Sequence, residues 1–248
     1  MMRVSQVHDF RYPRRRWIRA AIHHLTYGIF RVLADFQVVG GENLPERGPL
    51  LVVGNHFSFL DPVAMVSVVP WPMEFVGGFR VPNAPSAVAW LRKMWGYYPV
   101  YRGTGSQIAF RAAQAILEQG GILGIFPEGS SGAAVLRPPR PGAAFMAARA
   151  GVRVLPFGLD GLTEVFPALR RGRRARVTIR VGKLFGPFTV EGRGRARRAM
   201  IDAIGHEIMR RIAELLPHSR RGYYSSDPVL RAEALEAAYY PWDEVQEG

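Results

Sequence analysis

Residues 50–62 have the sequence LLVVGNHFSFLDP. The first four residues are leucine and valine, and Gly54 follows them directly, which predicts a short strand that is buried on both faces. Pro62 suits the first turn of a helix, because its ring fixes φ near the helical value. A buried strand that passes through a polar loop into a helix is a typical unit of α/β folds.

The same alternation of short apolar runs and helical patterns continues along the chain. Strands are predicted at residues 50–53, 74–77, 98–101, 122–126, 152–157 and 176–181. Helices are predicted at residues 85–95, 107–119, 142–150 and 196–215, with Ser106 as the cap of the second and Gly120-Gly121 as its end. Residues 176–181 alternate polar and apolar, as a half-exposed or edge strand does. The pattern predicts an α/β fold with a mixed, mostly parallel sheet that is flanked by helices on both faces.

A helical pattern also precedes the sheet, from about Trp17 to Phe36, after a polar and basic stretch at residues 1–16. Its apolar residues recur at spacings of three and four and therefore share one face: Ile18, Ile22, Leu25, Ile29, Val32, Leu33 and Phe36. Two interpretations stay open. A basic amphipathic helix that begins with tryptophan can lie in a membrane interface, and the same helix could dock on the protein's own core.

The composition narrows the class of protein. The 248 residues include no cysteine, which excludes disulfides, thiolate metal sites and a cysteine nucleophile. The formal charge of +13 favours anionic partners, although all but two of the 33 basic residues are arginine, which a GC-rich genome would also produce. The sequence shows neither a signal peptide nor a transmembrane run. We predict a basic arm and membrane-proximal helix (1–37), a catalytic α/β domain (38–218) and an acidic C-terminal tail (219–248) that could fold back on the basic body.

The chemistry is concentrated just after the predicted strand 50–53. Ligands of open α/β sheets bind beyond the carboxyl ends of strands, so His56 is expected at the edge of a site. Asp61 would begin the next helix and could fold back toward His56. A carboxylate on one imidazole nitrogen fixes the tautomer and makes the other nitrogen a general base for a hydroxyl. Asp61 could instead serve as a helix N-cap, and both roles can hold together.

Two further segments carry candidate substrate-binding residues. After the predicted strand 122–126, a proline, an acid and glycines form residues 126–132, FPEGSSG, whose backbone N–H groups could form an anion-binding nest. The alternative is an ordinary tight turn in which Glu128 is a capping or bridging group. Arg102 precedes a glycine-containing loop and a helix N-terminus, where phosphates often bind. Taken alone, its position favours an ordinary surface arginine over a phosphate ligand.

Taken together, three motifs resemble the lysophosphatidic acid/glycerolipid acyltransferase family. They are Asn-His with Asp five residues after the histidine (55–61), Pro-Val-Tyr-Arg-Gly (99–103) and Phe-Pro-Glu-Gly (126–129), in the family's order. The resemblance covers roughly residues 38–188, because residues 40–45, 140–144 and 154–157 are also similar to the family's conserved blocks.

The resemblance implies an O-acyltransferase without a metal or resident cofactor, which works at the cytoplasmic face of the cell membrane. Its acyl donor would be acyl-CoA or acyl-carrier protein, and its acceptor a lysolipid, 1-acylglycerol-3-phosphate first among them. It implies that His56 is the general base and Asp61 its orienting partner. The implied substrate-binding residues are Asn55, Arg102, Gly103, Phe126, Pro127, Glu128, Gly129, Ser130 and Ser131.

Two departures from the family's pattern leave the acceptor open. Ser130-Ser131 stand where the family usually has Thr-Arg, and residues 77–80 lack the lysine that the family tends to carry there. Arg137 and Arg140 lie downstream and could supply the missing charge. An aminolipid or a glycolipid acceptor therefore remains an alternative.

Two rival mechanisms or functions are also open. An acyl-serine intermediate would use Ser58, Ser130 or Ser131, although no Gly-x-Ser-x-Gly elbow is present. A non-catalytic binder of anionic membrane or nucleic acid is favoured by the arginines of residues 170–176, which we name the basic cluster. Nucleic-acid motifs are absent, so nucleic acid is not expected as a partner.

Overall fold

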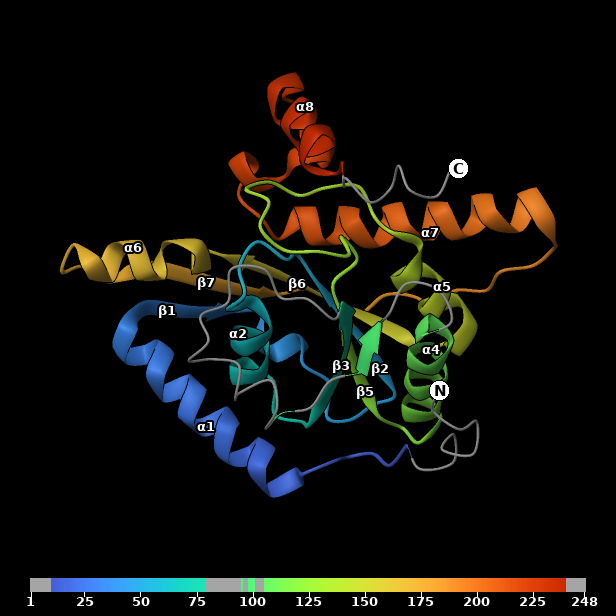
Figure 1. Ribbon diagram of the computed structural model, residues 1–248, viewed down its shortest axis with the longest axis horizontal. Helices are drawn as coiled ribbons and strands as arrows, with labels where there is room; N and C mark the ends of the chain where they lie inside the picture. The colour runs from blue at the N-terminus through green and yellow to red at the C-terminus, as the bar shows by residue number, and fades with distance from the viewer. Residues whose placement is uncertain (1–9, 79–94, 96–97, 101–104, 240–248) are drawn as a thin grey trace.

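The computed structural model describes residues 10–78, 95, 98–100 and 105–239. Within them, seven strands form one sheet in the order β1-β7-β6-β2-β5-β3-β4 (Figure 1). Their bounds are Ala34–Val39 (β1), Leu50–Gly54 (β2), Met73–Gly78 (β3), Tyr98–Val100 (β4), Ile122–Ile125 (β5), Arg153–Asp160 (β6) and Ala175–Val181 (β7). Neighbouring strands run parallel except β6 and β7, which are antiparallel. The predicted mixed, mostly parallel α/β sheet is confirmed.

Helices cover both faces of the sheet, as predicted. They are α1 (Arg16–Leu33), α2 (Asp61–Val68), α4 (Gly105–Glu118), α5 (Pro141–Ala150), α6 (Val165–Arg170), α7 (Gly194–Glu214) and α8 (Pro228–Ala237), with 3₁₀ turns at Gly41–Asn43, Leu162–Glu164, His218–Arg220 and Gly222–Tyr224. One core cluster packs α1, α2 and α6 against the sheet, and the other packs α4, α5 and α7 against the opposite face. The central strand β2 contributes Leu50 and Val52 to the first cluster and Leu51 and Val53 to the second, so its side chains are buried on both faces.

The first helix is shorter than predicted and turns a different face inward. It ends at Leu33, and the following residues form the edge strand β1, which pairs in parallel with β7. Of the predicted apolar stripe, Ile22 and Phe36 are buried, whereas Ile18, Leu25, Ile29 and Val32 are exposed. The inner face is built from Arg19, Ile22, Thr26 and Phe30. The periodicity identified the helix, but a helix with apolar residues on two sides does not reveal which side meets the core.

Other differences concern strand position and helix ends. Strand β7 lies between β1 and β6, so the interpretation of residues 176–181 as an edge strand is wrong: the unpredicted β1 covers it. Helix α4 begins at Gly105, which places Ser106 in its first turn rather than at its cap. Its predicted end is confirmed, because Gly120 has a φ of +75°. The predicted helix at residues 85–95 lies outside the described residues except for Trp95.

Residues 219–239 pack against the loop at residues 134–140. The Leu136 N–H donates to Arg220 O at 3.0 Å, and the Tyr223 N–H donates to Leu136 O at 2.9 Å. Gly222 lies between these two bonds with a φ of +47°, and a Cβ there would meet Leu136 O at 2.2 Å. Helix α8 follows this segment and lies beyond α7, at the top of the view in Figure 1. The three-part domain division stays a prediction, but its last part contributes ordered structure next to the Phe-Pro-Glu-Gly segment.

A buried ion pair fixes α1 to the sheet. Arg19 is 1% exposed, and its Nη1 and Nη2 donate to the two carboxylate oxygens of Glu74 on β3 at 2.6 and 2.8 Å. Arg14 Nη2 donates to the same carboxylate at 2.6 Å, and Arg19 also donates to Trp95 O at 2.9 Å. Burial alone would raise the pKa of Glu74, but the hydrogen bonds and charges of Arg19 and Arg14 outweigh it and lower the pKa below its usual value.

We expect the substitution Glu74→Gln to lower the free energy of unfolding by about 3–5 kcal/mol, because it leaves Arg19 buried without a counter-ion. Urea unfolding measures this. The control is Asp35→Asn, whose carboxylate meets Arg176 on the surface at 3.8 Å and should cost less than about 1 kcal/mol.

The difference between wild type and Glu74→Gln should depend on pH. A lowered folded-state pKa contributes stability above the unfolded-state value of about 4.3, and that stability is lost as the pH falls through the folded-state value. The stabilities of the two proteins should therefore begin to converge below the unfolded-state value and should meet only as the pH falls through the lower folded-state pKa of Glu74. A constant difference across that range would show that Glu74 does not act through its charge.

Candidate active site

His56 lies just beyond the carboxyl end of β2, between the ends of β5 and β6. Its Nδ1 is 3.0 Å from Asp61 Oδ2, and the side chain is 16% exposed. Asp61 is the first residue of α2 and is almost completely buried. The loop between them thus returns the carboxylate to the imidazole, and this places Nδ1–H on the carboxylate and leaves Nε2 as the basic nitrogen.

Asp61 also holds the loop in shape. Its Oδ2 accepts a second hydrogen bond from the Ser58 N–H at 2.7 Å, and Ser58 Oγ accepts from the Leu60 N–H at 3.2 Å. The structure gives no side-chain cap to α2, so Asp61 acts on the loop before the helix rather than as an N-cap. Burial raises the pKa of the Asp61 carboxyl, and the hydrogen bonds from His56 and Ser58 offset part of that rise.

Aromatic stacking sets the plane of the imidazole. The His56 ring stacks on Phe126 with centroids 4.1 Å apart and planes 18° apart, and Phe126 in turn stacks on Phe75 of β3 at 6.2 Å. Phe126 directly follows β5, so strands β2, β3 and β5 together orient one ring. With Nδ1 held by Asp61 and one face held by Phe126, the direction of Nε2 is fixed.

A buried carboxylate joins the His56 loop to the Phe-Pro-Glu-Gly segment. Glu128 Oε1 accepts from the His56 backbone N–H at 2.7 Å, and Oε2 accepts from Arg137 Nε at 3.0 Å. Arg137 Nη1 donates to Ser130 Oγ at 2.9 Å, and Nη2 bonds Ser130 O. Burial raises the pKa of Glu128, while the Arg137 guanidinium counteracts it. Glu128 is therefore the bridging group that the sequence allowed as one alternative.

Asn55 has a comparable bridging position on the other side of His56. Its Nδ2 donates to Leu159 O at 2.8 Å, and its Oδ1 accepts from the Leu159 N–H at 2.7 Å. The side chain is fully buried. Both ends of the amide therefore serve β6, and Asn55 fixes the position of His56 from the end of that strand. Its predicted contact with substrate stays a prediction.

A family model described as Acyltransferase matches residues 35–160, about half of the chain. The chain belongs to the acyltransferase family. The resemblance that rested on three motifs is confirmed by this match.

Relatives of this chain are described as 1-acyl-sn-glycerol-3-phosphate acyltransferases. A chloroplastic 1-acyl-sn-glycerol-3-phosphate acyltransferase of Brassica napus is 29% identical over 166 residues, which are 62% of this chain and 47% of that protein. The corresponding chloroplastic protein of Arabidopsis thaliana is 29% identical over 175 residues, 66% of this chain and 48% of that one. The chain spans about half the length of these relatives.

A solved structure supports the fold. The 1-acyl-sn-glycerophosphate acyltransferase PlsC from Thermotoga maritima aligns with a TM-score of 0.55 and 20% sequence identity, over 78% of this chain and 79% of that one. None of the helices within the described residues is both long and apolar enough to span a bilayer. No group of three metal-ligating side chains occurs among these residues either.

The remaining predicted site residues differ in how they are placed. Pro127 is buried, Gly129 is exposed with a φ of +78°, and Ser130 and Ser131 are half-buried. The Gly129 N–H donates to Phe126 O at 3.1 Å and closes the turn, so this donor does not point outward as an anion nest requires. Arg102 and Gly103 lie outside the described residues. Sequence reasoning missed Phe75 and Leu159, because only the sheet brings them to His56.

Proposed function

We propose that this protein is an O-acyltransferase that moves a fatty acyl group from a thioester donor to the hydroxyl of a lysolipid. Acyl-CoA or acyl-carrier protein is the donor, and 1-acylglycerol-3-phosphate is the acceptor that the relatives' descriptions favour. The observation that carries the proposal is the 3.0 Å contact of His56 Nδ1 with the buried Asp61 at the carboxyl end of a central strand. Such a pair is suited to remove a proton from a hydroxyl.

The proposed reaction is a direct transfer. The acceptor hydroxyl gives its proton to His56 Nε2 while its oxygen attacks the thioester carbonyl carbon, and the Asp61 carboxylate stabilises the imidazolium that forms. The tetrahedral intermediate then collapses, the carbon–sulfur bond breaks, and the leaving thiolate takes the proton from Nε2. His56 returns to its neutral form, so a resting base is available for the next acceptor.

The test of this function is acyl transfer by purified protein. Radiolabelled acyl-CoA and acyl-carrier-protein donors are offered with 1-acylglycerol-3-phosphate, lysophospholipids, a lyso-aminolipid and a glycolipid in mixed micelles. Transfer to 1-acylglycerol-3-phosphate would support the favoured acceptor. Transfer only to the lyso-aminolipid or the glycolipid would support the alternative acceptor that the serine at position 131 suggests. If the protein acylates no acceptor with either donor, on micelles or on vesicles, the proposal is contradicted.

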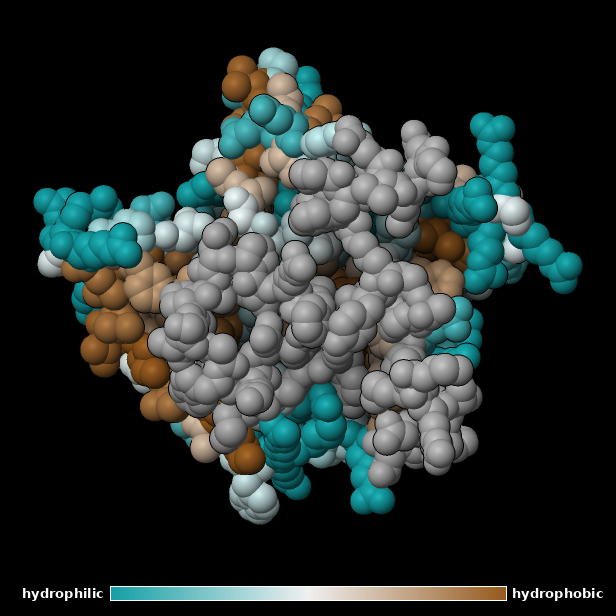
Figure 2. Space-filling model, viewed as in Figure 1, coloured by the Kyte–Doolittle hydropathy of each residue, from teal (hydrophilic) through white to brown (hydrophobic). Residues whose placement is uncertain are grey.

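The outer side of α1 supports a position at a membrane surface. Trp17, Ile18, Leu25, Ile29 and Val32 are exposed and form an apolar ridge along the helix. Hydrophobic side chains gather on this side of the molecule, at the left of Figure 2. We propose that the apolar ridge lies in the interface of an anionic bilayer, at the cytoplasmic face, so that the protein is peripheral or monotopic.

The basic cluster lies next to the carboxyl end of this ridge. Arg174 Nη2 bonds the carbonyl oxygens of Arg31 and Ala34, which places the loop that follows α6 against the end of α1. Arg170, Arg171, Arg173 and Arg176 are exposed in the same segment. Charges at this position would meet anionic headgroups when the ridge inserts, and each contributes about 1 kcal/mol near such a surface.

We expect Leu25→Ser combined with Val32→Ser to weaken binding to anionic vesicles by about tenfold or more, because full burial of each side chain contributes about 1.5–3 kcal/mol. Vesicle co-sedimentation measures the effect. The control is Val229→Ser, an equally exposed apolar residue on α8, which should bind as the wild type does. Unchanged binding of the double variant would exclude α1 as the membrane contact, and point changes are preferable to a deletion because Arg19 is part of the core.

A further inference from the structure

The loop at residues 134–140 is connected to His56 through a buried carboxylate. Arg137 in this loop donates from Nε to Glu128 Oε2 at 3.0 Å, and Glu128 Oε1 accepts from the His56 backbone N–H at 2.7 Å. Arg137 is 3% exposed and Glu128 is 1% exposed, so neither side chain has room to adjust into solvent. A displacement of the loop therefore reaches His56 through two contacts.

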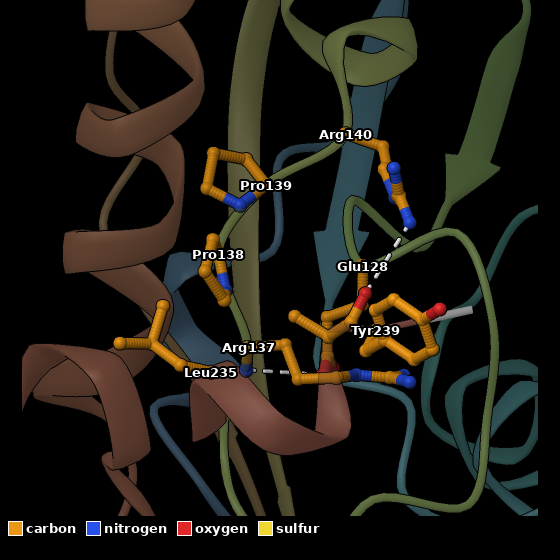
Figure 3. A pocket seen from close by; sticks show the side chains of 8 residues that line it. Glu128, Arg137, Pro138, Pro139, Arg140, Leu235 and Tyr239 are labelled. Carbon is orange, nitrogen blue, oxygen red and sulfur yellow. Dashed lines mark hydrogen bonds and ion pairs between the residues drawn. The ribbon is translucent and has the colours of Figure 1, made fainter. Parts of the chain in front are cut away.

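This loop has few means to hold its own shape. It forms neither helix nor strand, and Pro138 and Pro139 have no N–H to donate. A cavity of about 310 Å³ lies between residues 137–140 and the end of α8, so the loop is not packed tightly on that side (Figure 3). The position of the loop must therefore be set by contacts with other parts of the chain.

Residues 220–224, which we name the C-terminal clamp, supply such contacts. The Leu136 N–H donates to Arg220 O at 3.0 Å, and the Tyr223 N–H donates to Leu136 O at 2.9 Å, so both backbone groups of Leu136 are held. Leu136 is fully buried and directly precedes Arg137. The C-terminal clamp therefore fixes the residue next to the buried guanidinium.

The C-terminal clamp fits this loop closely and is anchored to α7. Gly222 lies between the two backbone bonds with a φ of +47°, and a Cβ there would collide with Leu136 O and lie 2.7 Å from Leu136 N. On the other side, Tyr224 Oη and His206 Nδ1 of α7 are 2.8 Å apart. Both contacts hold the segment in one place, so it can serve as a fixed support.

The C-terminal clamp also approaches the second support of His56. Arg220 Nη1 donates to Ala134 O at 2.9 Å, and Arg220 Nε is 3.8 Å from Asp160 Oδ1. Asp160 directly follows the residue whose backbone holds both ends of the Asn55 amide. The side chain of Arg220 therefore connects the loop that holds one support to the end of β6, which holds the other.

We propose that the C-terminal clamp positions His56 for proton transfer, and that it acts through the 134–140 loop and Glu128. The inference rests on the proposed acyl transfer. It assigns a role to a segment beyond the matched family model, which ends at residue 160. The residues of the C-terminal clamp are positioning residues, because they act on the base through the loop. Such positions matter, since a shift of about 1 Å in a reacting group can lower a rate about a hundredfold.

The kinetic test compares Gly222→Ala with Gly151→Ala. Both glycines have a positive φ, +47° and +59°, but a Cβ at Gly151 meets nothing within 4 Å, so only the first change displaces Leu136. We expect Gly222→Ala to lower kcat about tenfold or more and to leave the KM of the acyl donor nearly unchanged, because the base moves rather than the donor site. Gly151→Ala should retain the wild-type kcat, and thermal unfolding is measured for both variants.

A second pair of variants adds no backbone strain and therefore serves if Gly222→Ala does not fold. Arg220→Met removes the side-chain contacts with the loop and with β6, and we expect kcat to fall severalfold. Arg220→Lys should recover part of the loss. The control is Arg231→Met, an exposed arginine on α8 that donates to backbone carbonyls just before its own helix and should keep the wild-type kcat. Wild-type kcat in every folded variant of the C-terminal clamp would overturn the proposal.

The backbone amide signal of His56 in NMR separates this inference from the reaction, because it needs no substrate. The His56 N–H donates to a carboxylate at 2.7 Å, and the chemical shift of its proton depends on that distance. The protein is isotope-labelled at histidine, and the signal is assigned with His56→Ala. We expect Gly222→Ala and Arg220→Met to shift the signal, and Gly151→Ala to leave it in place.

The proposed reaction and the proposed positioning fail in different ways. If wild type acylates no lipid but Gly222→Ala or Arg220→Met shifts the His56 signal, the reaction is refuted and the role of the C-terminal clamp stands. If wild type acylates lipid and the signal is the same in wild type and in both variants, the reaction stands and the positioning role is refuted, since any loss of kcat would then arise elsewhere.

Discussion

Replacement of His56 by alanine is expected to lower kcat for acyl transfer by about 10²–10⁴-fold, because the variant has no group to receive the hydroxyl proton. The fold should survive. The bond to Glu128 comes from the His56 backbone N–H, which alanine retains, and the imidazole is partly exposed rather than part of the core. The KM values should change less than kcat, because the imidazole receives the proton only as the reaction proceeds.

The assay for this variant is initial-rate transfer from the better of the two donors, with thermal unfolding measured in parallel. His218→Ala is a suitable control, because His218 is an exposed histidine in a 3₁₀ turn after α7. Near-normal turnover by the His56 variant would refute the mechanism and would revive an acyl-serine intermediate or a non-catalytic role for the chain.

Asp61→Asn should impair kcat almost as severely, by about 10²–10³-fold or more. The amide oxygen can still accept the Ser58 N–H, so the loop should keep its shape. An amide cannot stabilise the imidazolium, and the variant loses control over which His56 nitrogen carries the proton. The expected profile is therefore a large loss in kcat with a small change in the free energy of unfolding.

A second readout distinguishes catalysis from structure at Asp61. Nitrogen NMR of His56 should report Nδ1–H as the main tautomer in wild type and a mixture in Asp61→Asn. If the variant keeps its turnover and the tautomer is unchanged, Asp61 only shapes the loop through Ser58. If the protein unfolds instead, Asp61→Glu, which retains the charge, should restore folding and part of the activity.

The sequence predicts those parts of the structure whose residues are close together along the chain. Strand β2 was evident from four consecutive buried apolar residues, and the contact of His56 with Asp61 spans only one loop. The Glu128 contact with His56 joins residues 72 apart, and the Asn55 contact with Leu159 joins residues 104 apart. Such partners depend on strand order, which periodicity does not encode.

Two local patterns were ambiguous for physical reasons. Val32 and Leu33 at the end of α1 are followed directly by Ala34 of β1, so no turn residue marks the change from helix to strand. The C-terminal segment is rich in charged side chains, which indicates exposure. Its order comes instead from backbone bonds around Gly222 and from contact with the 134–140 loop, and neither leaves a signal in residue type.

The buried contact of Arg19 with Glu74 has a consequence for how the protein would meet a lipid surface. It locks one side of α1 to β3, while the apolar ridge is on the other side of the same helix. Insertion of the ridge would then fix the tilt of the entire sheet and the height of His56 above the bilayer plane. The protein would sample substrate from a two-dimensional pool, and its rate would follow the mole fraction of lysolipid in the membrane rather than the bulk concentration.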